Sequence, residues 1–541
     1  MNSPSLIKVS LLVGSLAALG TSCPIARGQE APRGDVRLRL DLGNVANTMR
    51  GGIGASWHAI EMPLPYSEQP DPVFQIRSHG GSGWGAYPPA GDQAAWNQID
   101  RHARWLGLDF NRVEIEQRIY EPEEGRFTWD SPEMLILYKI LDWCERNRAD
   151  VFLQQMWSNV RWNAYPEWRD DTAGRLHSAP HDLDAFAAGL AALVEHLVRN
   201  KGYTCIRWLC ITNEPGNGFS WWQRSPNTPV ALRPGLEAVR RALDARGLKI
   251  PLSGGDLTVT IPAYDPHSFQ INGYAFDFHD LLGAYDFHSY YEDFDWLAKG
   301  IMAQADRNTV TWTTGAHREG KAFFLSEFGT MANGWGGEHP GPGLFPSVLK
   351  DAELVIRRLN AGVDGFNRWS FLNRGDLDGQ WQFVETWDRK QKRLLGQFTP
   401  HPNTYFLLGL LTRFTAKHSD VLMSELDGGQ IDSWRRVFAV LLRSPGGDLT
   451  LAVLNDAPRA FELSVEAKNL TGDANLYRYS VCEADKDRAD LKIDSHPGAQ
   501  LAPAHPNFRD SLTARSLTIY STYRLDHQDD GITTAGTRRS P

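Results

Sequence analysis

The chain has 541 residues, too many for one hydrophobic core, so we expect a large domain with one or two smaller ones. Its 42% apolar and 22% charged residues are typical of a globular protein, and its net charge of −9 argues against a partner made of nucleic acid or anionic membrane. The 19 tryptophans offer flat indole faces on which sugar rings can stack, a weak indication of a carbohydrate partner.

The first 29 residues are interpreted as an export signal. Lys8 precedes an apolar stretch, residues 9–19, that is too short to span a bilayer. Residues 19–23, LGTSC, resemble a bacterial lipoprotein cleavage site in which the leucine stands one place too early. A secreted or periplasmic protein is therefore expected, with a lipid anchor to the cell envelope at Cys23 as the alternative. The other four cysteines match no metal or redox spacing.

Residues 45–415 alternate between apolar strand patterns and amphipathic helix patterns, which is typical of a parallel sheet. Eight such units in more than 300 residues predict a (β/α)8 TIM barrel of the α/β class. A doubly wound open sheet fits less well, because no glycine-rich nucleotide loop follows an early strand. The predicted strands are residues 53–58, 110–115, 151–155, 206–212, 251–254, 285–288, 322–325 and 365–369. The predicted helices are residues 131–144, opened by Ser131-Pro132-Glu133, and 184–198, 235–248, 296–305, 348–359 and 405–414.

The pattern changes after residue 415. Residues 416–527 hold short alternating strands separated by turn residues, and they predict a smaller, all-β sandwich domain. The strand pattern at residues 34–44, which precedes the barrel, is expected to add to this sandwich. The polar tail, residues 528–541, is expected to be disordered.

Barrel active sites lie at the C-terminal ends of the strands, and two of these ends carry a glutamate. Glu214 ends the fourth predicted strand and Glu327 ends the seventh, 327 − 214 = 113 positions later. A unit of about 30 residues makes this three to four units, so both carboxylates can point into one cleft. Two carboxylates that flank a scissile bond are what glycoside hydrolysis needs: one protonates the leaving oxygen, and the other, if only about 5–5.5 Å away, attacks the sugar carbon and gives retention.

The polar residues near each glutamate indicate which one is the acid and which one is the nucleophile. Glu214 is expected to be the acid, and Glu327 the nucleophile, which must stay ionised beside a cation or hydrogen-bond donors. Arg112 and Tyr290 are the candidates for that task. Asn213 would bind the substrate hydroxyl next to the reacting carbon. For Arg112 a structural ion pair with Glu114 or Glu116 is the alternative.

The motifs TNEP after the fourth strand, SEFG at the seventh and HSYY at the sixth, with Arg112 and Trp369, resemble clan A of the retaining glycoside hydrolases. Within that clan, residues 50–415 resemble cellulase-like families and the xylosidase- and glucosylceramidase-like families with an added β-sandwich. The resemblance implies Glu214 as acid/base and Glu327 as nucleophile. It also implies Asn213 on the sugar 2-hydroxyl, Arg112 and Tyr290 on the nucleophile, and His288 and Trp369 lining the cleft.

Further residues at predicted strand ends are candidates for substrate binding, with core packing as the alternative for each: Trp57, His58, Trp157, Asn159 and Asn373. The loop with Asp376 and Asp378 has part of a calcium-binding pattern, but the later ligands are absent, so it is interpreted as a substrate-side loop. No metal and no cofactor is expected.

These observations predict a retaining glycoside hydrolase that cleaves O-glycosidic bonds of a poly- or oligosaccharide by double displacement. Two alternatives stay open. A transglycosylase would use the same two glutamates and differ only in its acceptor, and a non-catalytic carbohydrate-binding barrel would need no glutamate pair. The sugar, the linkage, exo or endo cleavage and the oligomeric state do not follow from the sequence.

Overall fold

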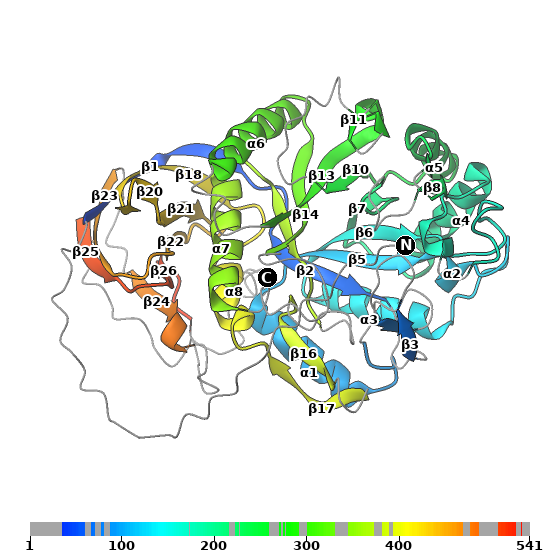
Figure 1. The fold of residues 1–541 in the computed structure, drawn as a ribbon, viewed down its shortest axis with the longest axis horizontal. Coiled ribbons are helices and arrows are strands. Elements are labelled where there is room, and N and C mark those ends of the chain that lie inside the picture. Colours follow the sequence, from blue (N-terminus) through cyan, green and yellow to red (C-terminus); the bar gives the residue numbers. More distant parts are fainter. Residues whose placement is uncertain are drawn as a thin grey trace, which may run out of the picture. The chain divides into compact units, whose positions relative to one another are not determined.

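The fold is described from a computed structural model, drawn in Figure 1. The structure describes residues 35–525 and 532, except 60–65, 71–76, 80–86, 172–173, 216–221, 227, 259–269, 272–273, 276, 292–299, 331–343, 373–380, 389–392, 469–475 and 486–506. The predicted export signal lies outside the described residues, as does the predicted tail apart from residue 532. No helix in the described part of the chain is long and apolar enough to cross a membrane.

A closed barrel of eight strands forms the larger part of the fold, and every neighbouring pair of strands is parallel. This confirms the predicted (β/α)8 class, and each barrel strand contains or overlaps one of the eight predicted segments. In barrel order the strands are β2 (Ile53–His58), β5 (Phe110–Glu116), β6 (Asp150–Trp157), β7 (Ile206–Cys210), β10 (Leu252–Thr258), β13 (Leu282–Tyr291), β14 (Ala322–Thr330) and β15 (Gly365–Arg368).

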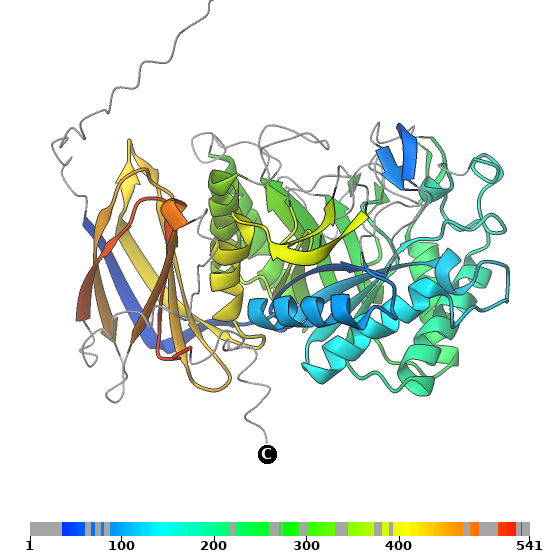
Figure 2. The ribbon, with the colours of Figure 1, turned by 90° about the horizontal axis from the view of Figure 1, so that it is seen from below.

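Helices lie around the outside of the barrel strands (Figures 1 and 2). They are α1 (Gln93–Leu106), α2 (Gln117–Tyr120), α3 (Pro132–Arg146), α4 (Leu183–Glu195), α5 (Arg233–Ala245), α6 (Ile301–Arg318), α7 (Phe345–Asn360) and α8 (Thr404–Arg413). In α3 the Ser131 hydroxyl accepts the Met134 amide and Pro132 occupies the first turn, as the sequence indicates. Helix α1 is missing from the sequence prediction, and the segment predicted at 296–305 only overlaps the start of α6.

The second domain is one eight-stranded mixed sheet that bends into two layers, as Figure 2 shows. Its order is β24 (Tyr477–Cys482), β26 (Ser516–Ser521), β22 (Leu449–Asn455), β21 (Val437–Arg443), β18 (Asp420–Gly428), β1 (Asp35–Thr48), β23 (Phe461–Lys468) and β25 (Asn507–Leu512). Alternate residues of β1, namely Val36, Leu38 and Leu40, point into the apolar core between the layers. The N-terminal strand β1 thus completes the sheet, antiparallel to β18 and parallel to β23.

Strands β21, β22 and β26 are apolar on both faces. One set of side chains fills the core between the layers, and the other set, including Val440, Leu454 and Ile519, belongs to the same apolar cluster as the barrel helices. Helix α7 contacts β21 and β22, and α8 contacts β24 and β26. The two domains are therefore joined by a shared apolar core within residues 35–525.

Candidate active site

The interior of the barrel is built in layers, with an apolar layer below a polar one. Phe110, Phe152, Cys210, Ala284 and Phe324 form a buried cluster inside the barrel. Because strand side chains alternate between the two faces, the residue two positions further along points inward as well. On the same five strands those residues are polar: Arg112, Gln154, Thr212, Asp286 and Ser326. The polar layer opens toward the C-terminal ends of the strands, where this fold places chemistry.

The two predicted glutamates converge above this polar layer. Glu214 follows β7 and Glu327 lies within β14. One carboxylate oxygen of each glutamate and a ring nitrogen of His288 all lie within 4.8 Å of one another. Glu214 has a φ of 44°, in the left-handed region, and its amide donates to the Asp256 carbonyl at 3.0 Å. A non-glycine residue held in that region is a feature of functional sites.

Hydrogen-bond donors surround the Glu327 carboxylate. Arg112 Nη1 donates to Oε1, Tyr290 Oη donates to Oε2 at 2.7 Å, and His288 Nδ1 lies 3.2 Å from Oε2. Burial alone would raise the pKa of Glu327, but the charges of His288 and Arg112 and the hydrogen bonds from His288 and Tyr290 outweigh it and lower the pKa. Glu327 is therefore ionised throughout the neutral range.

His288 links the two glutamates to a third carboxylate. Its Nδ1 donates to Glu214 Oε1 at 2.7 Å and its Nε2 donates to Asp256 Oδ1 at 2.7 Å. Burial would lower the pKa of His288, but Asp256 and Glu327 raise it well above its usual value. His288 is consequently an imidazolium, with a proton on each ring nitrogen.

Asp256 and Asp286 are the site residues that sequence reasoning missed. Asp256 accepts Gln154 Nε2 at 3.0 Å, and its amide donates to Asp286 Oδ1 at 2.5 Å. Burial and the charge of Asp256 raise the pKa of Asp286 to about 7. The signal was available for Asp256, because it follows the fifth predicted strand by two residues, where the strand-end rule applies.

Arg112 is the centre of the site. It is fully buried, its Nη1 donates to Glu114 Oε1 at 2.6 Å as well as to Glu327, and its Nη2 donates to Asn213 Oδ1 at 2.7 Å. Nη2 also lies 3.6 Å from Asp256. The contact with the nucleophile candidate and the ion pair with Glu114, which the sequence posed as alternatives, are both present.

His58 and Trp369 lie beside this group. His58 Nε2 is 2.9 Å from Glu114 Oε2, and the imidazole edge meets the Trp369 ring with centroids 4.9 Å apart. The Arg112 guanidinium lies 5.9 Å from the centroid of the Trp369 ring. Both residues are thus brought to the predicted site.

Trp57 is not brought there; of the two alternatives that the sequence left open, substrate binding and core packing, its contacts are those of core packing. Its indole nitrogen donates to Asn111 at 2.9 Å, and its ring packs against Trp143 of α3 and against Phe371. Trp57 precedes His58 on β2, so strand alternation turns it outward toward the helices. The Trp57 side chain therefore fills part of the apolar core between β2 and α3.

Two of the remaining candidates lie at the C-terminal end of β6, and the others fall outside the described residues. Trp157, at the end of β6, is 1% exposed in the large apolar cluster. Asn159 Nδ2 donates to Glu116 Oε2 at 3.2 Å. Asn373 and the loop with Asp376 and Asp378 fall outside the residues that the structure describes.

Two groups of side chains have the spacing of metal ligands: Glu214, His288 and Glu327, and separately Cys210, Asp256 and Asp286. Both ring nitrogens of His288 lie 2.7 Å from carboxylate oxygens, of Glu214 and of Asp256. Burial raises the pKa of Cys210 well above its usual value, which keeps the thiol protonated. We assign no metal ion to either group.

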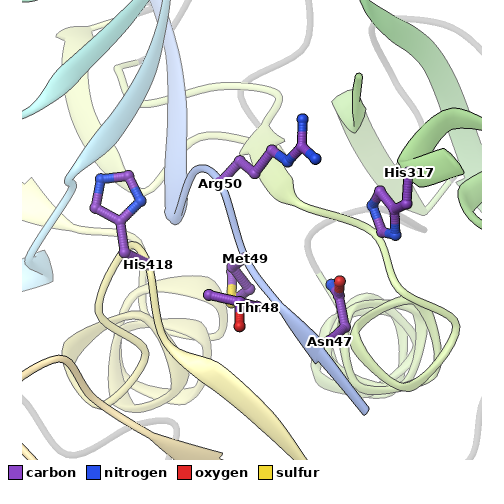
Figure 3. A pocket seen from close by; sticks show the side chains of 6 residues that line it. All are labelled: Asn47, Thr48, Met49, Arg50, His317 and His418. Atoms are coloured by element: carbon purple, nitrogen blue, oxygen red, sulfur yellow. The ribbon is translucent and has the colours of Figure 1, made fainter. Parts of the chain in front are cut away.

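A cavity of about 490 Å³ lies at the other end of the barrel and is lined by Asn47, Thr48, Met49, Arg50, His317 and His418. Figure 3 shows His317 and His418 on either side of Arg50. Arg50 Nη1 donates to the Gly320 carbonyl, and His317 Nε2 lies 2.8 Å from Asp364. These side chains support the junction between β1 and the barrel, and we assign no reaction to the cavity.

No protein-family model and no curated protein matches this sequence. The fold resembles that of a glycoside hydrolase family 30 subfamily 8 xylanase from Clostridium acetobutylicum, with 14% identity, 90% of this chain and 99% of that chain covered, and a TM-score of 0.55. An alpha-L-arabinofuranosidase from Thermotoga maritima gives 11% identity, 91% and 100% coverage, and a TM-score of 0.56. A conserved exported protein from Bacteroides fragilis is 13% identical, with 90% of this chain and 99% of that chain covered and a TM-score of 0.58. At these identities the likeness establishes the fold alone.

Proposed function

We propose that this protein is a retaining glycoside hydrolase that cleaves O-glycosidic bonds of a poly- or oligosaccharide by double displacement. The observation that carries the proposal is the approach of the Glu214 and Glu327 carboxylate oxygens to within 4.8 Å, with strong donors on Glu327. A separation of about 5 Å between carboxyl groups belongs to the retaining mechanism, since an inverting enzyme leaves room for a water molecule. The xylanase and the arabinofuranosidase of similar fold support the class.

Glu327 is assigned as nucleophile, because Arg112, Tyr290 and His288 hold it as an anion. Its oxygen attacks the anomeric carbon while Glu214 gives its proton to the leaving oxygen, and a glycosyl ester forms. In the second step Glu214 takes a proton from water, which attacks the ester and releases Glu327. Neither step requires a cofactor.

Asn213 is assigned to the substrate. Its amide oxygen accepts Arg112 Nη2, which turns the amide nitrogen toward other groups as a donor. A hydrogen bond from that nitrogen to the hydroxyl beside the reacting carbon strengthens as positive charge develops on the sugar ring. Trp369, which lies against His58 and Arg112, is proposed to line the same subsite.

The test starts from a panel of aryl glycosides and polysaccharides, with the anomeric configuration of the first product followed by NMR. We expect retention. Glu327→Gln should abolish formation of the glycosyl ester, and Glu214→Gln should retain activity only on dinitrophenyl glycosides, whose leaving group needs no proton. Full activity of either variant on an ordinary glycoside would refute the assignment.

Product analysis separates the two rival functions. A transglycosylase would join the glycosyl group to a sugar acceptor in preference to water, and a binding barrel would retain sugars and cleave none. Export stays a prediction, and mass spectrometry of the protein recovered from its native cells distinguishes a free N-terminus after residue 29 from a lipid on Cys23.

A further inference from the structure

One nitrogen of Arg112 serves two carboxylates. Nη1 donates to Glu114 Oε1 at 2.6 Å and to Glu327 Oε1. The guanidinium is fully buried, and Nη2 is held by Asn213, so the side chain cannot turn toward water. The positive charge that faces the proposed nucleophile is therefore divided between Glu327 and Glu114.

Glu114 has a second close neighbour, His58, on its other side. His58 Nε2 lies 2.9 Å from Glu114 Oε2, with the two side chains 1% and 2% exposed. His58 and Glu114 are paired in register across β2 and β5, and Arg112 and Glu114 are two residues apart on one face of β5. The backbone of two strands thus sets the distance between Glu114 and the guanidinium.

The proposed reaction changes the charge on one of these two carboxylates. When Glu327 forms the glycosyl ester, its oxygen bonds to the anomeric carbon and its negative charge is lost, while Glu114 keeps its own charge. The attraction between Arg112 and Glu327 weakens at that point, and the buried guanidinium still requires an anion beside it. Glu114 is the carboxylate already within 2.6 Å of the same nitrogen.

We propose that Glu114 is a positioning residue that shares Arg112 with the nucleophile and takes over its charge in the covalent intermediate. The inference rests on the proposed function. A carboxylate whose charge is less neutralised is a better nucleophile and a poorer leaving group. Glu114 therefore favours formation of the glycosyl ester and slows its hydrolysis.

The test is Glu114→Gln, which keeps the shape and an acceptor oxygen for Arg112 but removes the charge. With a glycoside of poor leaving group, which reports ester formation, kcat/KM should fall about tenfold, as expected for a change of one unit in nucleophile pKa. With a dinitrophenyl glycoside, which reports ester hydrolysis, kcat should stay level or rise, and the pre-steady-state burst should shrink. His58→Gln, which loosens Glu114, should shift both steps in the same directions by a smaller factor.

Glu116→Gln is the matched control, because Glu116 is the next inward glutamate of β5 and binds Arg118 and Asn159 instead of Arg112. Glu116→Gln should leave the ratio between the rates of ester formation and ester hydrolysis unchanged. If Glu114→Gln slows both steps by one factor, or changes neither, the proposal is wrong. If Glu114→Gln does not fold, His58→Gln decides by the same ratio. A native protein that hydrolyses no glycoside, or inverts the anomeric centre, overturns the proposed function instead.

Discussion

Replacement of Tyr290 by phenylalanine isolates one donor on the proposed nucleophile. The change removes the hydroxyl that donates to Glu327 at 2.7 Å and keeps the ring, whose centroid lies 5.9 Å from that of Trp381. A hydrogen bond to a charged group contributes about 1.5–3 kcal/mol, equivalent to a rise of about 1–2 units in the pKa of Glu327. The glycosyl ester would then have a poorer leaving group, so its hydrolysis should slow by about 10- to 100-fold.

The assay is a stopped-flow burst with a dinitrophenyl glycoside, together with mass spectrometry of the quenched protein. In Tyr290→Phe the ester should accumulate to about one glycosyl group per active site, which is opposite to the effect expected for Glu114→Gln. Tyr285→Phe is the matched control. Tyr285 lies toward the start of β13, away from Tyr290, and its hydroxyl donates to Glu319. A steady-state kcat for Tyr290→Phe within twofold of the unmodified protein would refute the role of this donor.

Three further outcomes concern the fold. Trp57→Ala should lower the free energy of unfolding by about 3–5 kcal/mol in urea titrations, while KM of the folded protein is unchanged. Gly54→Ala should prevent folding, because its Cβ would lie 1.6 Å from the Phe110 carbonyl oxygen, whereas Gly315→Ala, with open space in α6, should stabilise by about 1 kcal/mol in thermal melts. Burial and the charge of Arg368 lower the pKa of His401 to about 4, so the unfolded chain binds a proton there between about pH 6.5 and 4 that the folded protein does not. The free energy of unfolding is therefore lost as pH falls through that window. In His401→Asn the urea midpoint of unfolding should depend less on pH between about pH 6.5 and 4. An unchanged pH dependence of the midpoint would contradict the reasoning.

The barrel could be predicted because strand patterns and amphipathic helix patterns alternate along residues 45–415. The pair of glutamates followed from strand ends alone. Helix α1 was missed although Asp92 caps it, and most of α6 was missed because residues 306–318 hold threonines and a valine of low helix propensity. Tertiary packing against the barrel stabilises such a helix, and packing is not visible in a single sequence.

The sequence predicts which strand ends carry site residues. It does not predict which side of a strand each side chain faces or how far apart the side chains lie. Trp57 and His58 are neighbours in sequence, yet alternation places one among the helices and the other against Glu114. The sequence alone posed catalysis and a structural ion pair as alternatives for Arg112. Distances were needed to find that one guanidinium nitrogen serves both carboxylates.

The position of β1 has a consequence for biosynthesis. Val36 pairs with Leu463, so a strand near the start of the chain waits for about 430 further residues before its parallel partner exists. At 5–20 residues per second, translation of that length takes roughly 20 to 90 seconds. Both edges of β1 stay unpaired until β18, residues 420–428, has been made, and exposed strand edges recruit other chains. We therefore expect the nascent protein to depend on a chaperone or on translocation in the unfolded state, and a chain cut off before β18 to aggregate even though every residue of the barrel is present.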